Sequence, residues 1–118
     1  MKIRFIINPK SGTKDQTNIQ FEINKHLDLE KFDFDCVYTE YEKHASILCK
    51  EAINEGIDII AAVGGDGTVN ECANAIIGSK SALSIIPCGS GDGFALHLNI
   101  KRNIRLAIQQ LNNSHFKK

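Results

Sequence analysis

The segment Ile57–Ile77, IDIIAAVGGDGTVNECANAII, decides the fold of this 118-residue chain. Its first part, Ile57–Val63, is apolar and rich in β-branched residues, which predicts a buried strand. Its last part is apolar at helical spacing. The loop between them, GGDGT, contains three glycines, which permit a sharp turn and let backbone amides approach a ligand closely. A helix that follows directly adds free N–H groups and a positive dipole end, so the segment predicts an anion site, with phosphate as the best-fitting ligand.

The residues that open this helix carry further signals. Thr68 and Glu71 stand three apart, which predicts a capping box. Asp66 would repel phosphate unless its carboxylate contacts a metal, a ribose hydroxyl or an attacking hydroxyl; the alternative is an Asx-type turn residue. The loop is not a Walker A sequence, because no Gly-Lys-Ser/Thr follows. It is not the dinucleotide fingerprint either, because Asn70 stands where the last glycine would be.

Strand and helix patterns alternate on both sides of this segment. Short β-rich runs predict strands, and apolar residues every three or four positions predict helices. The predicted order is strand 3–7, helix 15–27, strand 33–38, helix 45–53, the central strand and helix, strand 83–86, a helical stretch 94–98 and helix 104–111. Gly56 and Gly78 stand at predicted helix ends. This order predicts a three-layer, Rossmann-like α/β domain with a mainly parallel sheet covered on both faces.

Two more loops follow predicted strands. Asn8 comes directly after the first strand, where it would either meet a nucleotide or belong to an Asn-Pro turn. A second glycine-rich loop, Gly89-Ser90-Gly91-Asp92-Gly93, follows the strand 83–86. Because ligands bind beyond the carboxyl ends of parallel strands, we expect the two glycine loops to face one another across a single crevice. This recurrence favours nucleotide binding.

Three motifs together carry a resemblance to a known family. They are INPKSG at 7–12, GGDGTVNE at 64–71 and PCGSGDGFA at 87–95, in the order expected of the diacylglycerol kinase and sphingosine kinase superfamily. The chain most resembles the nucleotide-binding domain of the bacterial lipid kinases, with a fold like those of phosphofructokinases and NAD kinases. By residue-level matching, the resemblance implies ATP contacts from the following positions: Asn8, Thr39, Gly64, Gly65, Asp66, Gly67, Thr68, Val69, Asn70, Gly89, Ser90, Gly91 and Asp92.

The resemblance also implies a reaction, in which the γ-phosphate of ATP passes to a lipid hydroxyl with Mg²⁺ present. In the sphingosine kinase branch the loop aspartate takes the hydroxyl's proton, which makes Asp66 the candidate catalytic residue. In the bacterial branch the proton acceptor and the magnesium ligands lie in a second, β-rich domain. We expect residues 1–118 to form the nucleotide-binding domain, with that second domain absent and little activity without it. Relatives more often have Gly-Thr followed by Asn-Asp-Phe-Ala; here Ser90 keeps the hydroxyl, whereas Gly93 replaces a polar residue.

Composition restricts the partners. Fourteen basic and fourteen acidic residues cancel, which gives no electrostatic reason to bind nucleic acid and suggests at most peripheral membrane contact. Short apolar runs and four cysteines without CxxC spacing favour a cytoplasmic protein with free thiols. A homodimer is expected if apolar surface stays uncovered. Two alternative functions remain: a free-standing nucleotide-binding or regulatory module, and a kinase of a soluble hydroxyl substrate such as NAD.

Overall fold

The computed structural model describes residues 1–8, 18–87 and 106–112. The elements in chain order are β1 (Lys2–Ile7), α1 (Asn18–His26), β2 (Asp33–Tyr38), α2 (His44–Asn54), β3 (Ile59–Gly64), α3 (Asp66–Ile76) and β4 (Ala82–Pro87). Residues 106–112 form a further helix. This alternation of strands and helices confirms the α/β order expected from the sequence, whereas the predicted stretch 94–98 lies outside the described residues.

The four strands form one parallel sheet in the order β2-β1-β3-β4. The chain first moves from β1 outward to β2 and then crosses back to β3 on the other side of β1. The strand order therefore reverses between β1 and β3. In open α/β sheets, ligands bind beyond the carboxyl ends of the strands at such a reversal.

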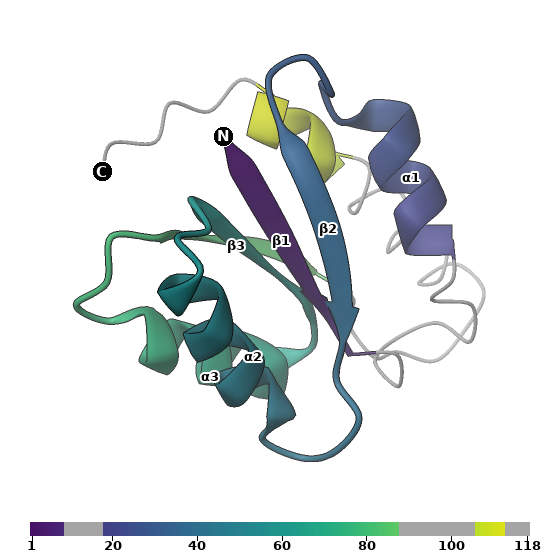
Figure 1. Ribbon diagram of the computed structural model, residues 1–118. Helices are drawn as coiled ribbons and strands as arrows, with labels where there is room; N and C mark the ends of the chain where they lie inside the picture. The colour runs from purple at the N-terminus through teal and green to yellow at the C-terminus, as the bar shows by residue number, and fades with distance from the viewer. Residues whose placement is uncertain (9–17, 88–105, 113–118) are drawn as a thin grey trace, which may run out of the picture.

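Helices cover both faces of the sheet, which gives the three layers visible in Figure 1. The helices α1 and 106–112 pack on one face, where Phe5, Ile23 and Ile108 are fully buried. The helices α2 and α3 pack on the other face around Ile6 and neighbouring side chains. Every residue of β3 is buried, as expected of a central strand between two helical layers.

Two glycines end helices as the sequence predicts. Gly56 follows α2 and Gly78 follows α3, and both have φ of +80°. This left-handed conformation is strained for residues with a Cβ, so glycine is favoured at both places. Lys43, before α2, also has positive φ, at 69°.

A buried cation joins three elements on the face covered by α2. Arg4 lies on β1, and its guanidinium donates to both carboxylate oxygens of Asp35 on β2, at 2.8 and 2.9 Å. It also donates to Glu55, the residue after α2, at 2.6 Å. These hydrogen bonds hold the pKa values of both carboxyl groups below their usual range. Glu55 therefore has a structural contact that the helical pattern of residues 45–53 does not predict.

The described cysteines are free thiols, as the sequence suggests: Cys36, Cys49 and Cys72. Cys49 and Cys72 are fully buried between α2 and α3, where the Cys49 thiol donates to the Cys72 carbonyl at 3.7 Å. Burial raises the pKa of the Cys36 thiol to about 11, so this thiol is protonated at neutral pH. Cys88 lies outside the described residues. None of the helices described here has the length and apolar character to cross a membrane.

Candidate functional site

The carboxyl ends of β1, β2 and β3 bring together residues that are far apart in the sequence. Asn8 follows β1, and its N–H donates to the carbonyl of Val63 on β3 at 3.0 Å. Thr39 follows β2, and its N–H donates to the carbonyl of Ile7 at 2.9 Å. Asn8 therefore lies at the reversal of strand order, beside the end of β3, whereas Thr39 lies at the same edge on the other side of β1. This is the edge at which the sequence predicts the site.

The first turn of α3 differs from the predicted capping box. The helix begins at Asp66, and its N-cap residue is Gly65, with no side chain bonded to the cap. Thr68 therefore lies inside the first turn, and Glu71 lies one turn into the helix. One carboxylate oxygen of Glu71 is buried without a hydrogen-bond partner among the described residues. The prediction of a capping box is wrong, because the helix starts two residues before Thr68.

Thr68 instead ties the helix to β1. Its side chain is 4% exposed, and its hydroxyl accepts a hydrogen bond from the side-chain amide of Asn8 at 3.5 Å. The first backbone hydrogen bond of the helix runs from the Val69 N–H to the Gly65 carbonyl at 3.1 Å. The N–H groups of Asp66, Gly67 and Thr68 precede it, so they have no acceptor within the helix. Such amides, at the positive end of the helix dipole, form a site that favours an anion.

The glycines of the loop serve a purpose other than the sharp turn predicted from the sequence. Gly65 is extended, at φ −86° and ψ −167°, and Gly64 and Gly67 are not among the glycines with positive φ. A Cβ on Gly64 would lie 2.9 Å from the Thr68 hydroxyl oxygen, so close packing requires this glycine. Cβ atoms on Gly65 and Gly67 would meet no described atom within 4 Å. Among the described residues, neither backbone conformation nor packing requires glycine at 65 and 67, so open space there suits a ligand that approaches the backbone.

The other predicted site residues on α3 divide into two groups. Asp66 and Asn70 are exposed, so their polar groups are available to a ligand. Val69 is partly buried and packs against the core cluster on the face covered by α2 and α3. The predicted residues of the second glycine loop, Gly89 to Asp92, lie outside the described residues. The strand that leads to this loop ends level with the first loop, because Pro87 is the register partner of Gly64.

Metal ligands are sparse in the part of the chain that the structure describes. No group of three or more His, Cys, Asp or Glu side chains there could hold a metal ion. At the start of α3, Asp66 offers a single exposed carboxylate. These residues do not by themselves fit a resident divalent cation, whereas the open amide edge fits phosphate.

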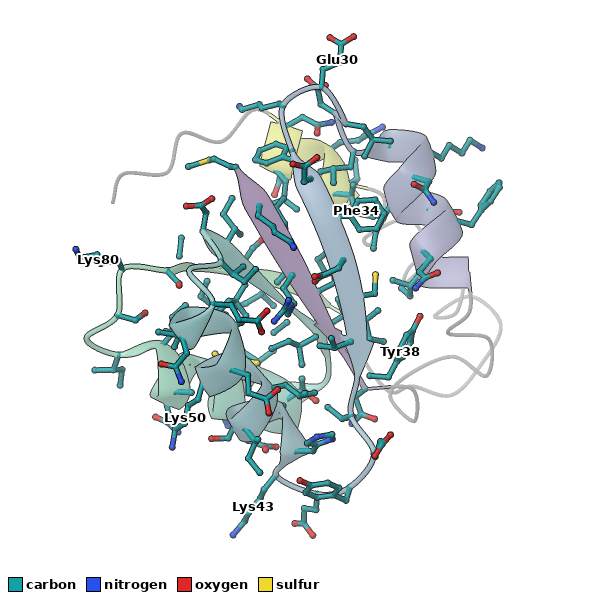
Figure 2. All side chains as sticks on the ribbon, in the orientation of Figure 1. Glu30, Phe34, Tyr38, Lys43, Lys50 and Lys80 are labelled. Atoms are coloured by element: carbon teal, nitrogen blue, oxygen red, sulfur yellow. The ribbon has the colours of Figure 1, made fainter. Side chains whose placement is uncertain are left out.

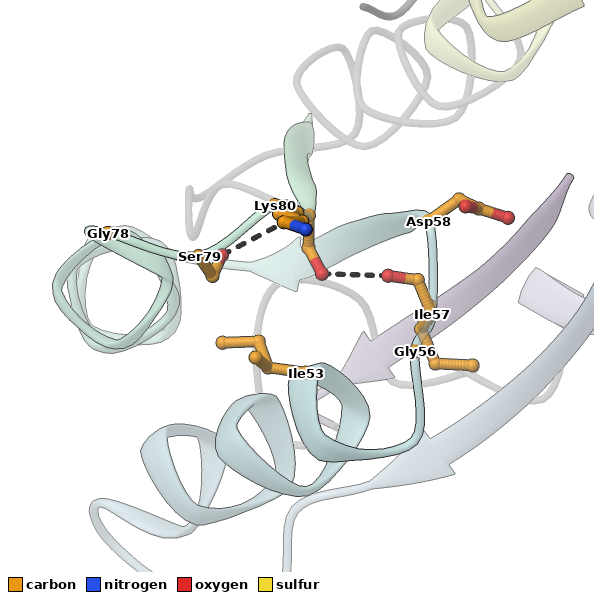
Figure 3. Close-up of a pocket in the computed structure, with 8 residues that line it drawn as sticks. Ile53, Gly56, Ile57, Asp58, Gly78, Ser79 and Lys80 are labelled. Atoms are coloured by element: carbon orange, nitrogen blue, oxygen red, sulfur yellow. Dashed lines mark hydrogen bonds between the residues drawn. The ribbon is translucent and has the colours of Figure 1, made fainter. Parts of the chain in front are cut away.

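Among the hollows lined by described residues, two lie at opposite edges of the sheet. One, of about 310 Å³, is lined at the carboxyl edge by Asn8, Thr39, Glu40, Tyr41 and Glu42. The other, of about 370 Å³, lies at the amino ends of β3 and β4 and includes Asp58 and Lys80 (Figure 3). There the Ser81 hydroxyl donates to the Ile57 carbonyl at 2.7 Å. Only the first hollow includes predicted site residues, Asn8 and Thr39.

Glu40, Tyr41 and Glu42 in this hollow were not predicted from the sequence. A signal was present: the run TEYE, at 39–42, places two carboxylates and an aromatic ring directly after the end of β2. Taken alone, that run is equally typical of a solvated loop. Its position beside Asn8 becomes apparent only when β2 pairs with β1.

A family model, curated relatives and solved structures similar to this chain all point to one family. The family model "Diacylglycerol kinase catalytic domain" matches residues 2–118. The diacylglycerol kinase of Staphylococcus haemolyticus is 31% identical over 114 residues, which cover 95% of this chain and 34% of that protein. Sphingosine kinase B of Dictyostelium discoideum is 27% identical over 114 residues, covering 91% of this chain and 15% of that one. The crystal structure of a diacylglycerol kinase from Bacillus anthracis str. Sterne superimposes with a TM-score of 0.72 at 29% identity, covering 97% of this chain and 42% of that chain.

The first of these relatives is much longer than this chain. The chain spans about a third of the length of the Staphylococcus relative, at 34%. The matched region in the present chain includes the whole candidate site.

Proposed function

The chain belongs to the diacylglycerol kinase catalytic domain family, and on that premise we propose that it forms the ATP-binding half of a lipid kinase. In this proposal the γ-phosphate of ATP passes to a lipid hydroxyl. The observation that carries the proposal is the uncapped start of α3, at the reversal of strand order, with open space over Gly65 and Gly67. A phosphate group needs such an arrangement of free amides and unobstructed backbone.

Each residue at this edge has a role in the proposal. The amides of Asp66, Gly67 and Thr68 would bind the phosphate oxygens. Asn8, held by its hydrogen bond to Thr68, would fix the position of the phosphate chain relative to β1. Gly64 lets Thr68 come close enough for this hydrogen bond. Phosphoryl transfer depends mainly on such positioning and on electrostatic stabilisation.

Asp66 is the proposed catalytic residue. Its carboxylate is exposed at the first position of α3, beside the proposed phosphate site. An acid in that place can accept the proton of an attacking hydroxyl. We propose that Mg²⁺ enters bound to the phosphates of the nucleotide, since the described residues lack a metal cluster of their own.

We propose that binding of the lipid substrate requires residues beyond these 118. The longer relatives provide the support for this division, because about two thirds of the Staphylococcus protein lies outside the match. A second domain would exclude water from the cleft and position the acceptor hydroxyl, and both effects lower the barrier to transfer. The isolated chain is therefore expected to bind ATP and to transfer phosphate slowly.

Calorimetric titration of the chain with ATP and Mg²⁺ tests the nucleotide site. We expect saturable binding that is lost in Gly67→Val, because the new side chain enters the space over the amides, where a Cβ meets no described atom within 4 Å. Asn74→Val is the matched control, since Asn74 is exposed on the same helix and away from its start. Circular dichroism should show that both variants are folded. If Gly67→Val and the wild type bind ATP equally, the phosphate site at α3 is refuted.

A further inference from the structure

Two buried cysteines meet where α2 packs against α3. The two helices lie side by side on one face of the sheet (Figure 1). Cys49 lies on α2 and Cys72 on α3, and the exposed fraction of both is 0%. Lys50, the residue after Cys49, is exposed and points outward (Figure 2), so Cys49 is on the inner side of its helix. The proposed phosphate site uses neither thiol.

Small side chains let the two helices approach each other closely at this point. The buried residues of α2 are Ala45, Cys49 and Ala52, which recur three or four positions apart and therefore lie on one side of the helix. The Cys49 thiol donates a hydrogen bond to the carbonyl of Cys72 at 3.7 Å. A hydrogen bond also joins the two side chains, and it is the strongest influence on the pKa of each thiol. The two sulfur atoms are therefore neighbours, as a disulfide requires.

The contact affects the two thiols in opposite directions. It holds the pKa of Cys49 below its usual value, because the Cys72 S–H can donate to the Cys49 thiolate. The same contact, together with burial, raises the pKa of Cys72. Since the thiolate is the nucleophile, Cys49 is the thiol that attacks an oxidant, and Cys72 keeps its proton beside it.

We propose that Cys49 and Cys72 form a reversible modification site, in which hydrogen peroxide oxidises the pair to a disulfide between α2 and α3. The Cys49 sulfur attacks one peroxide oxygen, which breaks the O–O bond, forms a sulfenic acid and releases water. The Cys72 sulfur then attacks the Cys49 sulfur, and the hydroxyl group leaves as a second water with the Cys72 proton. The two thiols lose two hydrogen atoms in total, and one peroxide is reduced to two waters. A dithiol reductant reverses the modification by thiol–disulfide exchange.

The disulfide would bind α2 covalently to the helix whose first turn forms the proposed phosphate site. The two cysteines are 23 positions apart, so the bond closes a loop that includes the whole of β3. Closing a loop of this length restricts the unfolded chain and stabilises the fold. Because both thiols are buried, peroxide reaches them only through local opening, and the reaction is expected to be slower than that of an exposed thiol.

The test uses the 118-residue chain with Cys36→Ala and Cys88→Ala, which leaves Cys49 and Cys72 as its two thiols. After overnight exposure to millimolar hydrogen peroxide, non-reducing mass spectrometry should show the loss of two hydrogen atoms and a Cys49–Cys72 linked peptide. The urea midpoint should rise by about 1–2 M. Dithiothreitol should restore both the mass and the midpoint.

Two further variants, Cys49→Ala and Cys72→Ala in the same background, are the controls. Alanine keeps a small apolar side chain at each position, and circular dichroism checks that both variants are folded. After peroxide, neither variant should lose two hydrogen atoms or gain stability to urea, and Cys49 should gain oxygen when Cys72 is absent.

Three results would overturn the proposal. The first is a folded chain that keeps both thiols reduced after the peroxide treatment. The second is oxidation of Cys49 to sulfinic acid while Cys72 is present, with no bond between them. The third is a disulfide that forms only when urea is present during oxidation, because the fold would then keep the two thiols apart.

Discussion

The side-chain amide of Asn8 donates to the hydroxyl of Thr68 at 3.5 Å across 60 positions of sequence. This hydrogen bond links the end of β1 to the first turn of α3, at the reversal of strand order. It therefore fixes the helix amides relative to the strand end. On the sheet face covered by α2, the buried Arg4 side chain joins β1 to β2 and to the end of α2.

Thr68→Val removes the acceptor of this hydrogen bond and keeps the side-chain shape. We expect the free energy of unfolding to fall by about 0.5–1.5 kcal/mol, as for one hydrogen bond lost from a buried site. Urea denaturation measures the change. Thr68→Ser keeps the hydroxyl and should retain more of the stability, so equal losses in both variants would assign the effect to packing.

Gly64→Ala should destabilise the fold through overpacking. The added Cβ would lie 2.9 Å from the Thr68 hydroxyl oxygen and 3.0 Å from its Cβ. We expect a loss of about 1–3 kcal/mol in the free energy of unfolding. Gly65→Ala is the matched control, because its Cβ meets no described atom within 4 Å and its φ of −86° suits alanine. Similar losses in both variants would contradict the close approach at Gly64.

Acid should weaken the contacts of Arg4 with β2 and α2. The Arg4 guanidinium lowers the pKa values of Asp35 and Glu55, so both carboxylates are charged in the fold at neutral pH. A lowered folded-state pKa contributes stability above the unfolded-state pKa, near 4, and this stability is lost as pH falls through the folded-state value. The urea midpoint should therefore fall below about pH 4. The Asp35→Asn variant should be less stable at pH 7, and its urea midpoint should change less between pH 7 and pH 3. If the midpoint of the variant changes with pH as much as that of the wild type, the stabilising role of the Arg4–Asp35 contact is contradicted.

Asp66→Asn should separate binding from catalysis. The test needs an active enzyme, so the chain is fused to the part of the Staphylococcus haemolyticus diacylglycerol kinase outside the matched region. We expect kcat for lipid phosphorylation to fall by about 10²- to 10⁴-fold, with ATP affinity retained, because a proton acceptor is lost. Asn74→Asp, on the exposed part of α3, controls for a changed charge. Full activity in Asp66→Asn would assign the proton acceptor to another residue.

Local sequence patterns predict the bounds of an element well where a single hydrophobic periodicity dominates the segment. Alternation in 33–38 predicted β2 with the bounds that the structure has, Asp33–Tyr38. Gly56 and Gly78 marked helix ends, because few other residues adopt positive φ at low cost. The capping pattern of Thr68 and Glu71 places the start of α3 too late, because the helix begins at Asp66. A Thr and a Glu three positions apart satisfy that pattern whether or not the helix has already begun.

Periodicity and glycine content are local properties, so the amino-acid sequence is enough to predict the α/β class and the parallel sheet, and to place the proposed anion site at GGDGT. Which distant residues meet depends on the folded arrangement of the strands. The pairing of β1 with β3 placed Asn8 beside Thr68, and the pairing of β1 with β2 placed the run 39–42 next to Asn8. The structure also decided that Glu55 binds Arg4. These relationships depend on strand order and register, which bring together residues with no common pattern along the chain.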